Sequence, residues 1–364
     1  MDQVIRSRND VWARVEDASA IGSLRRAAVA LAAARGFGDE DTGRVAVAVS
    51  EAASNLVKHA VEGVMLIRPH PESPTAVEVV ALDRGPGMRN VSRALRDGYS
   101  TAGTLGIGLG GITRMADGHE IYSVPGRGTV LAMCFTASGA PRPPFRVSGM
   151  TRPIGEETVC GDAFALVETG TVITAMVCDG LGHGDAAALA SREAVRVFLD
   201  HADLAPAAVL ERIHRGLAGT RGGAAAVVRM EGRPGGAGGS GTSGTGGTAD
   251  TGGTGGTGGT GGTVSFAGLG NISAWIAHQE GRQGMISVPG IAGHRAPRTL
   301  RQYEYAMPAH GMVVLHSDGL SDRWDVTSCP GLITRSPSVV AAALLREAGT
   351  RRDDACVVTV RPAA

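Results

Sequence analysis

A proline-rich stretch near the middle of the chain constrains its folding more than any other feature. Residues 137–148 (ASGAPRPPFRVS) contain three prolines. Proline lacks a backbone N–H and fixes its own φ angle, so this stretch disfavours both a continuous helix and a central strand. Because the segments on either side are each internally coherent, we expect a boundary here. The sequence thus predicts two domains, residues 1–137 and 149–364, joined by a linker at 138–148.

The composition excludes several classes of protein. The 364 residues hold 35 Lys and Arg against 35 Asp and Glu, so neither a nucleic acid nor a membrane surface is an expected partner. No apolar run approaches the roughly 18 residues that span a bilayer, and the N-terminus lacks the apolar core of a signal peptide. The five cysteines are scattered without a Cys-x-x-Cys spacing, which indicates reduced thiols rather than disulfides or a zinc site. These features favour a cytoplasmic protein.

A low-complexity tract lies inside the C-terminal segment. Residues 232–263 are built mainly of Gly, Thr and Ser and end in a Thr-Gly-Gly repeat. The tract has almost no apolar side chains to bury, so we expect a flexible insertion. Strands are predicted on both sides, at 224–230 and 264–267, which makes the tract a long hairpin connection within one domain.

Apolar periodicity predicts the main elements of both segments. In the N-terminal segment we predict helices at 21–34 and 39–60, a strand at 76–83 and a hairpin of 120–123 with 128–135. In the C-terminal segment we predict further strands at 171–179, 273–278, 312–317 and 356–360, and helices at 186–199, 207–217 and 338–348.

Four motifs follow one another in the N-terminal segment. Glu51 and Asn55 are four residues apart in a predicted helix, so their side chains share one face. Asp83 begins the stretch DRGPGM directly after a predicted strand. The glycine-rich stretch STAGTLGIGLGG at 100–111 opens a helix, and PGRGT at 125–129 lies at a turn between strands. Each motif alone is weak evidence, and the interpretation depends on their order.

Together these motifs suit a bound nucleotide. A glycine-rich turn before a helix presents backbone N–H groups to phosphates. The carboxylate of Asp83 can accept a hydrogen bond from an adenine amino group, and the amide oxygen of Asn55 can bind Mg²⁺. Glu51 can act as a general base on an incoming hydroxyl.

Acidic residues mark strand ends in the C-terminal segment. Asp162 follows a turn, Asp179 and Asp318 each follow an apolar strand, and Asp353 and Asp354 precede the last strand. Such carboxylates can converge on one edge of a β-sandwich, and oxygen ligands without Cys or clustered His suit Mg²⁺ or Mn²⁺. Two such ions close together can stabilise an in-line displacement at phosphorus. The segment therefore predicts a site for phosphoryl chemistry.

The N-terminal motifs resemble a known family. VSEAASNLVKHA at 49–60, DRGPGM and TLGIGLGG resemble the N, G1 and G2 boxes of the GHKL (Bergerat-fold) ATPases, especially the anti-sigma-factor serine kinases of bacterial partner switching. DGYST at 97–101 resembles the stress-module branch of those kinases. The resemblance covers nearly all of 1–137 and implies an α/β sandwich that binds ATP with Mg²⁺. It implies Asn55 as the Mg²⁺ ligand, Glu51 as the catalytic base and Asp83 as the adenine anchor. The residues implied around the nucleotide are Gly85, Gly87, Gly106, Gly108, Gly110 and Thr129.

The C-terminal segment resembles the SpoIIE-type branch of the metal-dependent protein phosphatase 2C family. The matching stretches are GDAFAL, VCDGLGHG, AGLGNI, GIAGH, LHSDGLSDRW and RDDACVVTV. The resemblance covers nearly all of 147–364 and implies an αββα sandwich with two Mn²⁺ or Mg²⁺ ions. The implied metal ligands are Asp162, Asp179, the carbonyl of Gly180, Asp318 and Asp353. Asp179 would bridge the ions, and Asp179 and Asp318 are the expected catalytic residues. Asp354 is expected to support a ligand rather than to be one, and His183 to be structural.

The two resemblances imply an α+β protein with two domains and two activities. The phosphatase would act on phosphoserine or phosphothreonine of a STAS-type anti-anti-sigma protein, and the serine-kinase-like module would be coupled to it. Other partner-switching proteins and a second copy of the chain are further partners that the resemblance allows. Two alternatives stay open. In one, the N-terminal domain only senses ATP; in the other, the chain is a non-catalytic adaptor for sigma-regulatory proteins.

Overall fold

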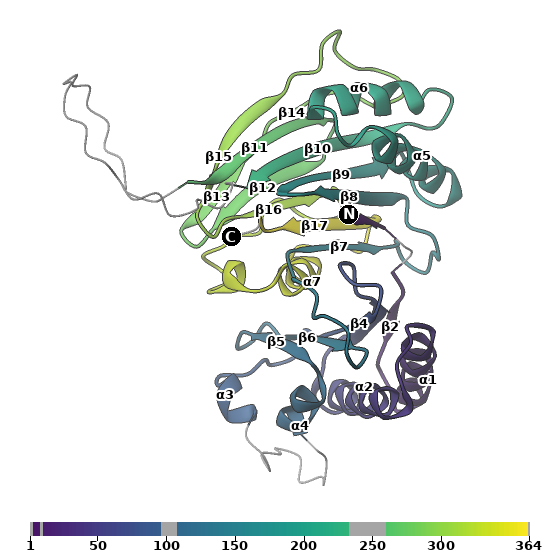
Figure 1. Ribbon diagram of the computed structural model, residues 1–364, viewed down its shortest axis with the longest axis vertical. Coiled ribbons are helices and arrows are strands. Elements are labelled where there is room, and N and C mark those ends of the chain that lie inside the picture. The colour runs from purple at the N-terminus through teal and green to yellow at the C-terminus, as the bar shows by residue number, and fades with distance from the viewer. Residues whose placement is uncertain (1–2, 8–9, 96–107, 233–259, 363–364) are drawn as a thin grey trace, which may run out of the picture.

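Three β-sheets form the frame of the molecule, one in the N-terminal part and two in the C-terminal part (Figure 1). The computed structural model describes residues 3–7, 10–95, 108–232 and 260–362. Across these ranges, no helix combines the length and the apolar character that a membrane crossing requires.

The N-terminal sheet carries its own helices on one face. Its antiparallel strands run in the order β2 (Trp12–Arg14), β3 (Val64–Pro69), β4 (Ala76–Leu82), β6 (Thr129–Thr136) and β5 (Gly118–Ser123). Helices α1 (Ser19–Ala34), α2 (Asp39–His59) and α4 (Gly108–Met115) pack on this face, and the short α3 (Val91–Ala94) lies beside them. Acidic residues in the first turn of α2 and basic residues in its last turn complement the helix dipole. The predicted helices, strand and hairpin of this segment are confirmed.

The C-terminal part is an αββα sandwich, as predicted. One sheet contains β1 (Gln3–Arg6), β8 (Asp162–Thr169), β9 (Val172–Gly180), β10 (Gly223–Gly232), β11 (Thr260–Leu269), β14 (Ser287–Val288) and β15 (Tyr303–Pro308). The other contains β13 (Gly281–Gly284), β12 (Ser273–His278), β16 (Met312–His316), β17 (Ala355–Val360) and β7 (Val147–Arg152). Helices α5 (Asp185–His201) and α6 (Pro206–Gly216) cover the first sheet, and α7 (Pro337–Glu347), which follows the 3₁₀ turn η1 (Leu332–Thr334), covers the second.

Burial on both faces explains why strands such as β9 are continuous apolar runs. Ile173, Ala175 and Val177 point into the core between the two sheets. Met176 and Cys178, at the alternate positions, point toward α5 and α6. Side chains alternate between the two faces of a strand, so a strand covered on both faces needs apolar residues at every position.

The Gly/Thr-rich tract connects two paired strands. β10 and β11 are antiparallel neighbours in a register that joins Gly232 to Gly262, directly beside the tract. The predicted hairpin is therefore confirmed at both of its ends, while residues 233–259 lie outside the described residues.

The first strand of the chain departs from the predicted division at residue 137. β1 pairs antiparallel with β8 of the C-terminal sandwich, with Ile5 opposite Leu166. Ile5 is buried in the core between the two C-terminal sheets. The linker in the structure is also shorter than the expected range of 138–148, because β7 already begins at Val147. A strand of four residues is too short to show a periodic apolar pattern, so its pairing with a distant segment could not be predicted from the sequence.

Helix α7 joins the two domains because it is buried on two sides. One side contacts Met150 and Val357 of the C-terminal sheet, and the other contacts Val80 and Val130 of the N-terminal sheet, all within one apolar cluster. Its central Ala341, Ala342 and Ala343 are completely buried. Short side chains let sheets approach a helix closely from both directions. The two domains therefore share a core rather than merely touching.

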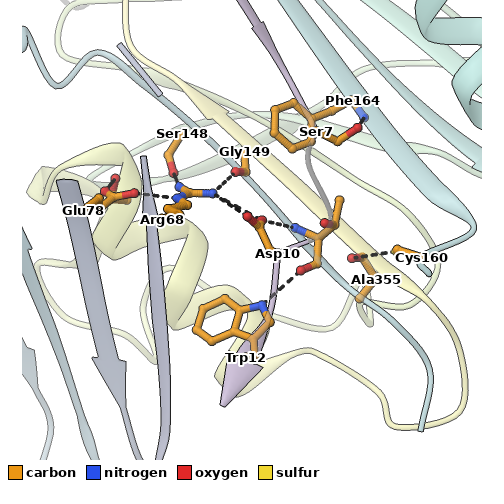
Figure 2. Close-up of polar contacts among 12 residues, drawn as sticks. Ser7, Asp10, Trp12, Arg68, Glu78, Ser148, Gly149, Cys160, Phe164 and Ala355 are labelled. Carbon is orange, nitrogen blue, oxygen red and sulfur yellow. Dashed lines mark hydrogen bonds and ion pairs between the residues drawn. The ribbon is translucent and has the colours of Figure 1, made fainter. Parts of the chain in front are cut away.

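A buried polar network crosses the same interface (Figure 2). Arg68 on β3 donates from Nε to Glu78 at 2.7 Å and from Nη1 to the carbonyl of Gly149 on β7 at 2.6 Å. Its Nη2 donates to the hydroxyl of Ser148 at 3.1 Å, and Asp10 lies 3.3 Å from Nη1. Charged groups in such a site are tolerated only when partners surround them.

Arg68→Met should weaken the whole molecule, because it leaves the buried carboxylates of Asp10 and Glu78 without their cation. We expect a loss of about 3–5 kcal/mol in the free energy of unfolding, measured by urea denaturation. The matched control is Arg196→Met, which removes an arginine paired with Glu193 and Asp200 on the exposed side of α5. Equal losses in the two variants would contradict the structural importance of the network.

Candidate functional site

Three predicted acidic residues of the C-terminal domain line one pocket. Asp179 comes from the end of β9, Asp318 from the turn after β16, and Asp353 from the turn before β17. All three border a cavity of about 560 Å³. Asp162 stands directly opposite Asp179 in the register of β8 and β9, and it is buried behind the pocket. Residues far apart in the sequence thus converge on one edge of the sandwich.

Close backbone packing fixes the position of Asp179. Gly180 follows it, and a Cβ atom at this glycine would lie 2.2 Å from the carbonyl oxygen of Ala187 on α5. Asp179 itself pairs across the sheet with Ala224 on β10. A side chain at position 180 would push α5 away from the strand end, so the glycine allows the helix to begin beside the pocket.

The gathered carboxylates repel one another. Burial, followed by the negative charges of Asp318 and Asp353, raises the pKa of Asp179 to about 7. Burial and then the charge of Asp353 raise the pKa of Asp318. For Asp162, burial and then the charge of Asp179 raise the pKa. Each shift reflects the cost of holding a negative charge near others in a poorly solvated place.

Hydrogen bonds orient the acidic side chains around the pocket. Asp354 accepts from the backbone N–H groups of Ile154 and Gly161, each at 2.8 Å. These bonds engage both oxygens of its carboxylate, and Asp353 rather than Asp354 lines the pocket. Asn271, in the turn between β11 and β12, donates to Asp318 at 2.7 Å. Asn271 is a functional candidate that no motif singled out, although it lies in the matching stretch AGLGNI.

The donor set fits a divalent metal ion. It consists of oxygen atoms, and Oδ2 of Asp162 is buried with no hydrogen-bond partner among the described residues. Hard cations such as Mg²⁺ and Mn²⁺ prefer such ligands. Within the same ranges, His, Cys, Asp and Glu side chains do not form a group of three that could hold an ion as they stand. A cation would offset the repulsion among the carboxylates and favour their closer approach.

His183 stands apart from the acidic residues. Its side chain is 61% exposed, and its Nδ1 lies 3.4 Å from a carboxylate oxygen of Glu157. It does not line the carboxylate pocket.

The predicted nucleotide residues lie in the second half of α2 and directly after β4. Glu51 and Asn55 are partly exposed on one face of α2. Asp83 follows β4 and accepts a hydrogen bond from the N–H of Gly85 at 2.6 Å. Burial raises the pKa of Asp83. A Cβ atom at Gly85 would lie 2.9 Å from the carbonyl oxygen of His59, so the glycine brings the strand end against the end of α2.

The turn at 125–129 closes against the same strand end. Gly128 has a φ angle of +80°, and a Cβ atom there would lie 2.0 Å from the carbonyl oxygen of Asp83. The carbonyl of Thr129 accepts from the N–H of Asp83 at 3.0 Å, and its hydroxyl lies 2.9 Å from that of Ser123. Gly108 begins α4, which also contains Gly110. Gly106 and the stretch DGYST lie outside the described residues.

Comparison with known proteins matches both halves of the chain. The family model for a histidine kinase-like ATPase domain matches residues 12–135, and the model for Stage II sporulation protein E (SpoIIE) matches residues 169–363, more than half of the chain. The serine/threonine-protein kinase RsbT of Bacillus subtilis (strain 168) is 37% identical over 95 residues, which are 26% of this chain and 71% of RsbT.

Two solved structures are similar to part of the chain. A chain from work on the bacterial stressosome is 25% identical with a TM-score of 0.48, over 59% of this chain and 98% of that chain. RsbX in complex with magnesium is 15% identical with a TM-score of 0.45, over 60% of this chain and 94% of that chain. TM-scores below 0.5 do not establish a common fold by themselves, so the assignment depends on the family models and on RsbT.

Mn²⁺ should stabilise the protein through the carboxylate pocket. A ligand present at about 100 times its Kd and bound only by the folded state adds about 2.7 kcal/mol of stability. Asp179→Asn should lose most of this gain, because it removes a charged ligand from the centre of the set. Isothermal titration calorimetry and thermal unfolding with and without Mn²⁺ measure the effect. Asp203→Asn, at an exposed position between α5 and α6, should retain it; an equal loss there would contradict the assignment.

Proposed function

Because the chain belongs to the SpoIIE family and carries a histidine kinase-like ATPase domain in the same polypeptide, we propose that it is a bifunctional regulator of partner switching. Its C-terminal domain would remove phosphate from phosphoserine or phosphothreonine of a STAS-type anti-anti-sigma protein. One observation carries the proposal: Asp179, Asp318 and Asp353, from three separate strand ends, border one pocket. Burial and then the neighbouring negative charges raise the pKa values of Asp179 and Asp318, and such a costly arrangement supports a functional site.

In the phosphatase site, Asp179, Asp318 and Asp353 would hold two Mn²⁺ or Mg²⁺ ions, with the carbonyl of Gly180 beside Asp179. When bound, such cations neutralise charge on a phosphoryl group and make nearby water more reactive. The buried Oδ2 of Asp162 has no protein partner among the described residues, so it could accept a hydrogen bond from a water molecule. Asn271 would keep Asp318 oriented through its 2.7 Å hydrogen bond.

In the N-terminal domain, Asp83 would accept a hydrogen bond from the adenine amino group of ATP. Asn55 would supply an oxygen ligand for Mg²⁺, and Glu51, one helical turn away, would accept a proton from the attacking serine hydroxyl. The glycines Gly85, Gly87, Gly106, Gly108 and Gly110, together with Thr129, would lie around the nucleotide.

A second function for this domain, ATP sensing, is favoured by a specific contact. Glu62, just after α2, forms ion pairs with Arg84 beside Asp83 and with Arg351 beside Asp353. The Arg84 pair is 3.3 Å long. A change at the nucleotide-binding turn could therefore reach the carboxylate pocket through one shared carboxylate.

Phosphatase activity is the first test. With Mn²⁺, the protein should hydrolyse p-nitrophenyl phosphate and a phosphoserine STAS protein, measured as released phosphate. Asp179→Asn should lower kcat/KM by at least about 100-fold, because it removes the residue proposed to hold both ions. Asp203→Asn serves as the control. If the wild-type protein releases no phosphate with either Mn²⁺ or Mg²⁺, the proposed activity is wrong.

Transfer of labelled phosphate from ATP separates a kinase from a sensor. A kinase should label a STAS protein, and Glu51→Ala should abolish the labelling while ATP still binds, because the proton acceptor is lost. Radiolabel incorporation and fluorescent nucleotide binding give the two readouts. A wild-type protein that transfers no label but changes its phosphatase rate with ATP would instead establish the sensor.

A further inference from the structure

A second cavity lies between the two domains and borders the carboxylate pocket. This interdomain cleft has a volume of about 480 Å³. Its wall includes Asp353, which also lines the carboxylate pocket, so the two cavities meet at this residue. The charged residues that line the cleft include Arg84, Arg152, Arg346, Arg351 and Glu62.

The lining of the cleft holds five arginines and five Asp or Glu residues, but in one part of it three arginines from the two domains gather around a single carboxylate. Arg84 and Arg351 share the single carboxylate of Glu62. Arg152, at the end of β7, donates to the carbonyl of Thr350 and lies near both of them. Burial, followed by the charges of Arg84 and Arg351, lowers its pKa. The mutual repulsion of these cations would be relieved by a further anion.

Arg346 adds a buried donor without a partner. Its side chain is only 1% exposed, and its Nε and Nη2 donate to Glu347 at 3.1 and 2.8 Å. Its Nη1 is buried and has no hydrogen-bond partner among the described residues. Leaving a buried charged donor unsatisfied is costly, and an acceptor on a ligand in the cleft would remove that cost.

We propose that the interdomain cleft binds the polypeptide that flanks the phosphoserine of the substrate, and that its arginines select acidic side chains there. The proposal rests on the phosphatase function proposed above. The phosphate would enter the carboxylate pocket, and the flanking residues would continue past Asp353 into the cleft. Guanidinium groups bind carboxylates through strong, directional hydrogen bonds. Since both domains supply arginines, only the docked pair of domains forms this binding surface.

Two synthetic peptides test the proposal. Both carry one central phosphoserine; one has glutamates and the other has glutamines on either side. The wild-type protein should prefer the acidic peptide by about tenfold in kcat/KM. Arg351→Ala should reduce that preference to about twofold, and Arg351 is suited to replacement because its side chain is 71% exposed. Glu62→Gln should increase the preference, because it releases two arginines from their shared partner.

The decisive quantity is the ratio of kcat/KM for the acidic peptide to kcat/KM for the glutamine peptide, because a change at the metal site affects both peptides equally. Arg212→Ala, an exposed position on α6 away from the cleft, should keep the wild-type ratio (Figure 1). Fluorescence anisotropy of both peptides without metal measures the same preference independently of turnover. Equal values for the two peptides in the wild-type protein, while p-nitrophenyl phosphate is hydrolysed, would overturn the inference. Failure to hydrolyse p-nitrophenyl phosphate would instead overturn the proposed phosphatase.

Discussion

The burial of α7 between two sheets is the constraint on which the rest of the structure depends. The helix completes the C-terminal sandwich on one side and covers the open face of the N-terminal sheet on the other. Neither surface could face water without exposing a broad apolar area. The buried Arg68 adds directionality to this contact, because its hydrogen bonds to Ser148 and Gly149 on β7 are satisfied in one arrangement of the domains only. The residues proposed to bind the nucleotide and the acidic residues of the pocket are thereby held in a fixed relation.

The candidate site lies at the edge of the sandwich where carboxylates gather at an electrostatic cost. Folding brings Asp162, Asp179 and Asp318 together although burial and then the charge of Asp179 raise the pKa of Asp162, and burial and then the charge of Asp318 raise the pKa of Asp179. Burial of the apolar side chains on both faces of the β-sandwich strands stabilises the fold and offsets this electrostatic cost. Loops at strand ends carry the charges, and the rigid sheets behind them set the spacing. In the adjoining cleft, Arg84 and Arg351 share the carboxylate of Glu62, so a local group of arginines lies beside the acidic one.

Local patterns in the sequence were sufficient for most elements but not for the contacts between distant ones. The helices and the long strands carry their own periodicity, and α2 and β9 were predicted within a residue of their observed bounds. The motifs around Asp83 and Asp179 marked residues that the structure places at strand ends. No periodicity could reveal that β1 pairs with β8, that α7 is covered twice, or that Asn271 reaches Asp318. These features depend on long-range packing, which a single sequence does not encode locally.

The pairing of β1 with β8 also affects how the chain is made. The ribosome releases β1 first, but its partner follows only after the entire N-terminal domain. The N-terminal domain can fold before β8 has been synthesised, because its own strands and helices are close together in the sequence. During that time β1 has no partner strand. Until β1 arrives, β8 presents an open edge to which another nascent chain could add. Once β1 is paired, the edge of this sheet is a strand of four residues instead of the eight of β8, and a short edge strand offers fewer free backbone groups to another chain.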